Sequence, residues 1–351
     1  MVSLSVVALA KDAAQHLPRF FTCLEGLADQ VIIGDLGSTD GTIEAAKKQG
    51  AQVLPITDKD DYAKARNRLL AMAQSEWVLV LDCHETMSNP DLKGLKDFLE
   101  HTEHEVFIFT IRNYTEDRHL MGWRPSDIAA YTGYVPAKQA RLFRNKPFIR
   151  FSYPVHETLM PSIEGKGLDV KEIQDIAIHN HDYTDQLEHF YNILKGLKQN
   201  YPDDLKITYD LALAHLRKGH LGSAKSLFSE IVQRMPSYKN ALTNLATIVL
   251  REGDHYNAAK LFLKAIDNDP KDINAYHNMG QLLWKKGDHE KAEFFFKKAL
   301  TIEHKEPRLI AALAKVYRSQ GRDDEARSLI ERGLRMLPKN AILTEALSRL
   351  K

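Results

Sequence analysis

The sequence contains only two cysteines, Cys23 and Cys83, among its 351 residues. Two cysteines cannot build a disulfide framework, and a chain of this length needs none, so we expect a reducing compartment and a cytoplasmic location. The net charge is also close to zero, because 48 basic and 47 acidic residues leave a formal charge of +1. The sequence therefore provides no overall field that would attract nucleic acid or an anionic membrane.

The sequence also lacks an apolar run long enough for a transmembrane segment. Residues 2–10 are apolar but too short to span a bilayer, with no basic residue before them and no small-residue cleavage site after them. We interpret this run as a buried strand. What the chain does have is length and 44% hydrophobic residues, which is enough for two domains that each bury a core.

The C-terminal half repeats with a period of 34 residues. Each repeat has a turn glycine, an alanine five residues later, a small residue before the turn and a large apolar residue after it. The four sets are Gly219, Gly253, Gly287 and Gly321; Ala224, Ala258, Ala292 and Ala326; Ala212, Ala246, Gly280 and Ala314; and Phe228, Phe262, Phe296 and Ile330. Such residues form the core between stacked helix pairs. The pattern resembles tetratricopeptide (TPR) proteins and predicts four repeats with a capping helix over 205–351, after a linking helix or half repeat at 184–204.

The N-terminal half alternates short β-rich runs with helical stretches. The runs are residues 4–9, 31–33, 52–56 and 77–81, and the helical stretches are residues 13–27, 43–49 and 63–73. This alternation predicts an α/β fold with a mostly parallel sheet, whose ligands bind at the carboxyl ends of the strands. A Rossmann oxidoreductase is excluded, because no Gly-x-Gly-x-x-Gly follows the first strand.

Two polar segments that follow predicted strands contain candidate ligand-binding residues. Residues 34–42 form a glycine-rich turn with Asp35 and Asp40, which can approach a nucleotide; alternatively, Asp40 only caps the next helix and the glycines only form the turn. In the second segment, Asp82 and His84 can both reach one divalent ion, which would neutralise a diphosphate leaving group. The alternative there is a simple cap and turn.

Motifs in the first 183 residues resemble the family 2 glycosyltransferases of the GT-A fold, in particular those with TPR repeats behind the catalytic domain. The resemblance implies a GT-A domain at 1–183, Rossmann-like with a mostly parallel sheet. The sequence departs from the family pattern at Asp12, Ala13, Leu36 and His84. The matching motifs are Lys11-Asp12 after the first strand, Asp35 to Thr42, Tyr62 to Asn67, Asp82-Cys83-His84-Glu85, Arg141 to Arg144, Val155-His156-Glu157 and, more loosely, His181-Asp182-Tyr183.

The resemblance implies a site for a nucleoside-diphosphate sugar, with UDP as the expected nucleotide. It places Asp35 near the base, Asp40 near the ribose and Arg66 near the nucleotide or diphosphate. Asp82 and His84 would hold a divalent metal, as the similar Asp-x-His of the polypeptide N-acetylgalactosaminyltransferases does. Imidazole favours Mn²⁺, with Mg²⁺ as the alternative. A late histidine, His181 or His156, would supply a third metal ligand.

Family 2 enzymes mostly invert the sugar's configuration, which requires a carboxylate that removes the acceptor's proton. Glu157 is the first candidate for this base. Glu85 is the second candidate, and its alternative role is a salt bridge with Arg66 or Arg141.

Two classes of function follow. The first is a transferase that moves a hexose or N-acetylhexosamine to a peptide, a protein or a glycan precursor, while the TPR groove positions the acceptor or forms a homodimer. The second is a catalytically decayed domain that serves as a TPR scaffold for binding proteins, which the departures from the family pattern favour.

Overall fold

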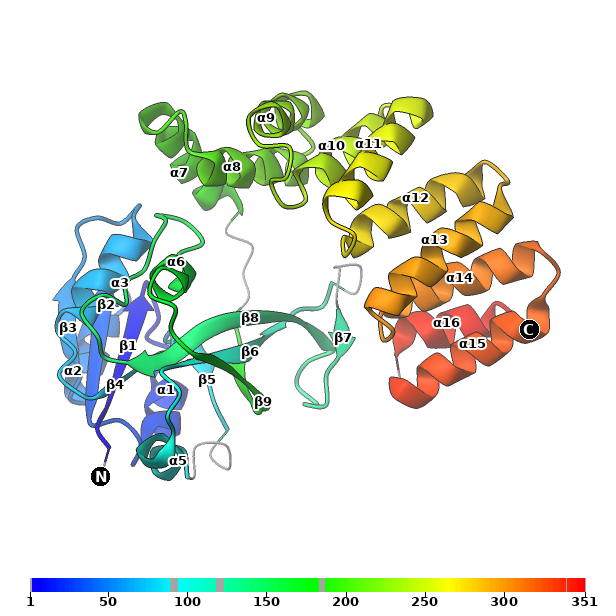
Figure 1. Cartoon of the computed structure of the whole chain (residues 1–351). Helices are drawn as coiled ribbons and strands as arrows, with labels where there is room; N and C mark the ends of the chain where they lie inside the picture. The colour runs from blue at the N-terminus through cyan, green and yellow to red at the C-terminus, as the bar shows by residue number, and fades with distance from the viewer. Residues whose placement is uncertain (1, 89–93, 118–122, 183–186, 339, 351) are drawn as a thin grey trace. The chain divides into compact units, whose positions relative to one another are not determined.

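The computed structural model describes residues 2–88, 94–117, 123–182, 187–338 and 340–350 (Figure 1). The chain divides into two compact units, Met1–Asp185 and Gln186–Lys351. None of the described helices combines the length and the hydropathy that a membrane crossing requires.

The first unit is built on one mixed sheet with strand order β3-β2-β1-β4-β8-β6-β9-β5, and β7 pairs with β8. Strands β3, β2, β1 and β4 are parallel to one another, as the alternating pattern predicts, whereas β8 is antiparallel to both β4 and β6. The strands are β1 (Leu4–Ala10), β2 (Gln30–Asp35), β3 (Gln52–Pro55), β4 (Trp77–Val80), β5 (Glu85–Thr86), β6 (Val106–Tyr114), β7 (Arg124–Pro125), β8 (Gly133–Arg144) and β9 (Val170–Asn180).

Helices cover both faces of the parallel half of this sheet. The central strand β1 is buried along its whole length; Val6 packs in one cluster with Phe20 of α1, and Val7 packs in the other with Leu69 of α3. Burial on both faces explains why this strand reads as a continuous apolar run. The described helices of the unit are α1 (Leu17–Leu24), α2 (Thr42–Lys48), α3 (Tyr62–Leu70), α5 (Leu95–His101) and α6 (Met160–Glu164).

Helix α1 is shorter than the predicted stretch of residues 13–27. Pro18 stands in its first turn, and the backbone amide of Ala13 donates a hydrogen bond to the hydroxyl of Thr42 rather than joining a helix. Gly26, at a φ of 74°, lies just beyond its end. Proline favours the first turn, and glycine readily takes the left-handed conformation that ends a helix.

The second unit is all-α, and its helix pairs follow the 34-residue period. The four turn glycines have φ values of 78°, 87°, 81° and 74°, and the alanine five residues after each glycine is fully buried. These observations confirm the predicted TPR-like repeats. The described helices are α7 (Leu187–Asn200), α8 (Leu205–Arg217), α9 (Leu221–Arg234), α10 (Ala241–Arg251), α11 (His255–Asn268), α12 (Ile273–Lys285), α13 (His289–Ile302), α14 (Pro307–Ser319), α15 (Asp323–Met336) and α16 (Ala341–Ser348).

Candidate active site

Arg66 lies at the centre of the polar residues beyond the end of β4. Its Nη1 and Nη2 donate to the two carboxylate oxygens of Asp82 at 2.9 and 2.7 Å, and its Nε donates to Oε1 of Glu157 at 2.7 Å. The backbone amide of Leu9, in β1, donates to Asp82 as well. Helix α3 thus brings together two carboxylates that are far apart in the sequence, and the planar guanidinium fixes the direction of both.

A second ion pair lies next to the first one. Glu85 is 2% exposed; its Oε1 accepts from Nη2 of Arg141 at 2.9 Å, and its Oε2 accepts from the backbone amide of Asp82 at 2.9 Å. Of the two salt-bridge partners expected for Glu85, Arg66 and Arg141, Glu85 pairs with Arg141. Because both oxygens of Glu85 are engaged, this carboxylate orients the backbone of Asp82.

The charges of this cluster favour a further cation. Three carboxylates, Asp82, Glu85 and Glu157, pair with the two guanidinium groups of Arg66 and Arg141. These ion pairs therefore contain one more negative than positive charge, which is costly for groups that are mostly buried. Burial would raise the pKa of Asp82, but the charge of Arg66 and its hydrogen bonds outweigh burial and hold this pKa well below its usual value.

Potential metal ligands also lie close together here. Oxygen or nitrogen atoms of Asp82, His84 and Glu85 lie within 4.8 Å of one another, and they form the one such group found among the described residues. An ionised carboxylate offers about four lone-pair directions, and three hydrogen bonds occupy three of those of Asp82. The donor set and the charge therefore fit a divalent metal ion that binds Asp82 and His84.

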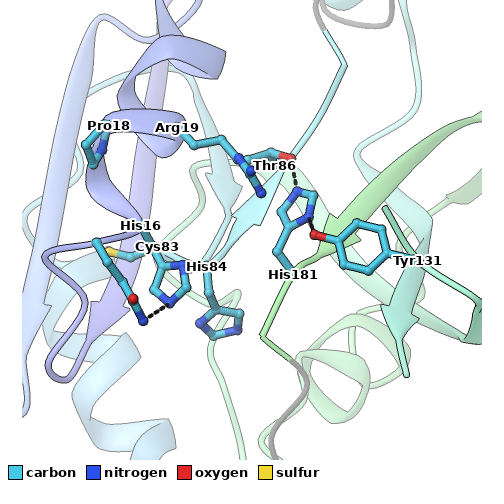
Figure 2. A pocket seen from close by; sticks show the side chains of 9 residues that line it. His16, Pro18, Arg19, Cys83, His84, Thr86, Tyr131 and His181 are labelled. Carbon is cyan, nitrogen blue, oxygen red and sulfur yellow. Dashed lines mark hydrogen bonds between the residues drawn. The ribbon is translucent and has the colours of Figure 1, made fainter. Parts of the chain in front are cut away.

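His84 and His181 line one cavity of about 390 Å³ (Figure 2). Both ring nitrogens of His181 are engaged, Nε2 with Thr86 Oγ1 at 2.7 Å and Nδ1 with the hydroxyl of Tyr131 at 2.7 Å. Burial and the nearby charge of Arg19 lower the pKa of His181 to about 4, so its imidazole is neutral at pH 7. His181 can bind a metal only if one of these hydrogen bonds is given up.

His156, the other candidate third ligand, is exposed and has a φ of 54°. It precedes Glu157 in the loop before α6 and does not line the cavity of His84 and His181 among the described residues. Positive φ is uncommon for residues other than glycine and is frequent at functional loops.

Asp35 and Asp40 organise the loop that follows β2. Asp35 is buried and accepts hydrogen bonds from the backbone amides of Gly37 and Ser38. Asp40 is exposed; the hydroxyl and amide of Thr42 and the amide of Ala14 donate to it, and these bonds lower its pKa. The residue at the N-cap of α2 is Gly41, so Asp40 is not a simple helix cap.

The loops after β1 and β2 are linked by side chains. Asp12, at a φ of 48°, accepts from the amide of Thr39 at 2.7 Å, and its own amide donates to the hydroxyl of Ser38 at 2.9 Å. The Nζ of Lys11 donates to the carbonyl of Gly37. Asp12 departs from the family pattern, yet it joins the two loops into one wall beside the carboxyl ends of the strands.

Sequence reasoning missed part of the cavity in Figure 2, namely His16, Arg19 and Thr86. Tyr131, which also lines this cavity, belongs to the aromatic stretch of residues 114–134, whose composition suits an acceptor-side lid or a packed surface loop. His16 and Arg19 come from the start of α1, which follows the end of β1, and Thr86 follows the end of β4. Their places after parallel strands were a usable signal, because loops after parallel strands meet at one edge of the sheet. Tyr131 follows no such strand, and its position depends on the paired strands β7 and β8.

Comparison with known proteins assigns a family model to each half of the chain. Residues 5–155 match the model for glycosyl transferase family 2. Residues 197–338 match the model for the middle TPR-like domain of cilia and flagella-associated protein 70. The first match contains Asp35, Asp40, Arg66, Asp82 and His84, and it ends just before His156 and Glu157.

Curated relatives match about half of this chain. A TPR repeat-containing protein of Synechococcus elongatus is 33% identical over 165 residues, which cover 46% of this chain and 37% of that protein. An uncharacterized glycosyltransferase of Rickettsia prowazekii is 27% identical over 169 residues, which cover 46% and 53%. The SPbeta prophage-derived glycosyltransferase SunS of Bacillus subtilis is 24% identical over 171 residues, which cover 47% and 37%. The matched part thus spans about half or less of each relative.

Among solved structures, the chain resembles a thermophilic TPR protein of Thermus thermophilus, with a TM-score of 0.41 and 24% identity, covering 47% of this chain and 90% of that one. The family 2 match and the glycosyltransferase relatives support a role in glycosyl transfer. The chain carries a glycosyl transferase family 2 domain at its N-terminus and a TPR-like domain at its C-terminus.

Proposed function

We propose that this chain is a metal-dependent glycosyltransferase that moves a hexose or N-acetylhexosamine from a UDP-sugar with inversion of configuration. The observation that carries the proposal is the group of Asp82, His84 and Glu85 at the end of β4, whose ligand atoms lie within 4.8 Å of one another. The excess negative charge of the surrounding ion pairs favours a divalent cation there.

Separate residues of the site would bind the metal, orient its ligand and receive the nucleotide. Asp82 and His84 would hold Mn²⁺ or Mg²⁺, with His181 as the third ligand after it leaves Thr86 or Tyr131. A metal ion held there would stabilise the negative charge of the departing diphosphate. Arg66 would keep the Asp82 carboxylate in its orientation. Asp35 and Asp40 would shape the loop that receives the nucleotide.

Glu157 is the preferred base that takes the acceptor's proton. Its side chain is 16% exposed, whereas that of Glu85 is 2% exposed and has both oxygens engaged. A base must reach the acceptor hydroxyl or amide directly or through one water, so the more accessible carboxylate is the better candidate. Glu85 then acts as a positioning residue behind Asp82.

The acceptor in this proposal is a peptide, a protein or a glycan precursor. The TPR-like unit would position the acceptor or build a homodimer, because such arrays commonly bind other proteins. The proposed location is the cytoplasm, where the two free and buried cysteines would remain reduced.

Calorimetry of the full chain with UDP, with and without MnCl₂, tests the metal site. We expect Mn²⁺-dependent UDP binding in the native protein, binding weakened about tenfold or more in His84→Ala, and no detectable binding in Asp82→Ala. His255→Ala is the matched control, because His255 is an exposed histidine of α11 in the other unit. Circular dichroism must show that each variant is folded, since Asp82→Ala also leaves the buried Arg66 with one partner fewer.

His84→Ala separates loss of the metal from loss of folding, because His84 is half-buried and takes part in none of the ion pairs of Arg66 and Arg141. Unchanged Mn²⁺-dependent UDP binding in folded Asp82→Ala and His84→Ala would contradict the proposed site. Besides the departures from the family pattern, the decayed-scaffold alternative has one structural observation in its favour: Asp82 and Glu157 are both engaged by Arg66. If no nucleotide sugar of a panel binds in the presence of metal, that alternative replaces the transferase.

A further inference from the structure

The cavity that His84 and His181 line presents hydrogen-bond donors and no acidic side chain. Arg19 and the hydroxyl groups of Thr86 and Tyr131 line it as well (Figure 2), and none of its described lining residues is Asp or Glu. The carboxylates of the neighbouring ion pairs are engaged by the two buried arginines instead. The cavity therefore offers positive charge and donors to a ligand.

Arg19 has no partner of its own in the part of the chain that the structure describes. Its side chain is exposed and forms neither an ion pair nor a hydrogen bond with another described residue. It stands in the first turn of α1, where the helix dipole disfavours a cation. No acidic residue lies three or four positions from it. The helix thus gains no stability from this charge.

The side chain of Arg19 is directed at the cavity. It extends from α1 toward Thr86 and His181 in Figure 2. After burial, the charge of Arg19 contributes most to the lowered pKa of His181, which agrees with a guanidinium close to this ring. A guanidinium presents its N–H donors in a planar fork that matches the two oxygens of a carboxylate.

Hydroxyl groups supply a second donor to the same space. His181 is neutral at pH 7, and a neutral imidazole has one donating and one accepting nitrogen. It therefore takes the proton of only one of its two hydroxyl partners, Thr86 and Tyr131. The other hydroxyl keeps a proton that a ligand can accept. If His181 turns to a metal ion, the hydroxyl that it leaves becomes available as well.

Tyr131 is held in place by a row of rings. Its ring stacks on that of Tyr114, with centroids 4.0 Å apart and planes inclined by 15°. The hydroxyl of Tyr114 is hydrogen-bonded to Nδ1 of His179 at 2.7 Å, so the row is anchored in β6 and β9. A side chain that is fixed before the ligand arrives loses less conformational entropy on binding.

The cavity has the size and the position for the sugar of a nucleotide-sugar donor. Its volume of about 390 Å³ lies in the range of small-molecule sites. In the proposed function a metal ion at His84 holds the diphosphate, and the sugar is bonded directly to that diphosphate. Because His84 itself lines the cavity, the sugar has this space next to it.

We propose that the transferred sugar carries a carboxylate, so that the donor is a UDP-hexuronic acid. The carboxylate accepts hydrogen bonds from the guanidinium of Arg19 and from the free hydroxyl of Thr86 or Tyr131. Charge-assisted bonds of this kind are about twice as strong as those that a neutral hexose forms. The inference rests on the proposed function and narrows its hexose to one that is oxidised to the acid at the exocyclic carbon.

The transfer step is the same as for a neutral sugar. The bond between the anomeric carbon and the diphosphate oxygen breaks, a bond between that carbon and the acceptor forms, and the acceptor's proton passes to Glu157 while UDP leaves. The carboxylate takes no part in these steps and serves recognition alone. A phosphate on the sugar fits less well, because it carries a charge of about −1.5 to −2, and Arg19 is the one permanent cation among the described lining residues.

Calorimetry of the full chain in MnCl₂ tests the inference with UDP-glucuronic acid and UDP-glucose, which differ only at the exocyclic carbon of the sugar. The native protein should bind UDP-glucuronic acid about tenfold more tightly than UDP-glucose. Arg19→Gln should reduce this preference to about twofold or less, because the carboxylate loses its charged partner.

Lys48→Gln is the matched control, because it also removes one positive charge from the unit. Lys48 is exposed in the last turn of α2 and does not line the cavity, so this variant should keep the preference of about tenfold. Both substituted positions are exposed, and circular dichroism should show that both variants are folded.

Three results would overturn the inference although UDP still binds. The first is equal affinity of the native protein for the two nucleotide sugars. The second is equal weakening of UDP, UDP-glucose and UDP-glucuronic acid by Arg19→Gln, which would assign Arg19 to the diphosphate. The third is a preference that falls as much in Lys48→Gln as in Arg19→Gln. In each case the transferase proposal stands, whereas a native protein that binds no UDP contradicts both.

Discussion

At the scale of single residues, Arg66 is a buried cation whose position depends on two ion pairs. It is 6% exposed and makes ion pairs with both Asp82 and Glu157. Its guanidinium also lies 5.6 Å from the centre of the Phe151 ring. A buried cation is tolerated only when its partners and hydrogen bonds replace water. Any substitution must therefore affect both the stability of the unit and the orientation of Asp82.

Arg66→Lys keeps the charge but removes the fork of donors. Lysine cannot donate to Asp82 in a bidentate way and reach Glu157 at the same time, so we expect the free energy of unfolding to fall by about 2–4 kcal/mol. Mn²⁺-dependent UDP binding should weaken as well, because Asp82 loses its fixed orientation. Urea denaturation and calorimetry measure the two effects.

Arg68→Lys, two residues along α3, is the control for this variant. Arg68 is half-buried and makes one long contact of 3.4 Å with Thr57, so its substitution should change the free energy of unfolding by no more than about 0.5 kcal/mol. If Arg66→Lys proves as stable as Arg68→Lys, the ion-pair network around Asp82 does not contribute the expected stabilisation of about 2–4 kcal/mol.

At the scale of elements, the turns between paired helices depend on backbone conformation rather than on packing. Gly253 has a φ of 87°, and a Cβ added there would meet nothing within 4 Å. Gly196, in the middle of α7, also has open space around it, but its backbone is helical. The two glycines therefore isolate the effect of conformation from that of crowding.

Alanine should act in opposite directions at these two glycines. Gly253→Ala forces a side chain into the left-handed region and should destabilise the second unit by about 1–2 kcal/mol. Gly196→Ala should stabilise it by up to about 1 kcal/mol, because alanine is the better helix former. Thermal unfolding of both variants is the measurement. A shift in the same direction for both would show that conformation does not control these turns.

The repeats could be predicted from the sequence because each of their features is local or recurs at a fixed spacing. A glycine such as Gly253 marks its turn, and a buried alanine such as Ala258 marks the helix crossing that follows. Helix α1 was predicted too long because its start is decided by a tertiary contact, the hydrogen bond from Ala13 to Thr42. Periodicity within one segment carries no information about such a bond.

The candidate site, likewise, could be predicted from the sequence only where its residues are close together in the chain. The motif around Asp82 placed the potential metal ligands, because ligands near each other in the chain must be near each other in space. The motif could not show that Arg66 would join Asp82 to Glu157, 91 residues from Arg66 in the sequence. It also could not show that Tyr131 would engage His181. Such contacts depend on how β6, β8 and β9 pair, which the sequence pattern left open.

At the scale of the whole molecule, the two units have separate cores. The cluster that contains Phe228, Phe262 and Phe296 draws its buried residues from the second unit, and the two clusters around β1 draw theirs from the first. Units whose cores share no residue can unfold in separate transitions. Ligands of one unit should then stabilise that unit alone.

We therefore expect scanning calorimetry to resolve two transitions that respond to different changes. Phe262 is fully buried, so Phe262→Ala should cost about 3–5 kcal/mol and lower one midpoint by about 10 °C, while the other midpoint stays within about 1 °C. UDP with MnCl₂ should raise the midpoint that Phe262→Ala leaves unchanged. A single transition whose midpoint falls in Phe262→Ala and rises with the nucleotide would mean that the two units unfold together. The stability of the second unit would then be linked thermodynamically to nucleotide binding in the first.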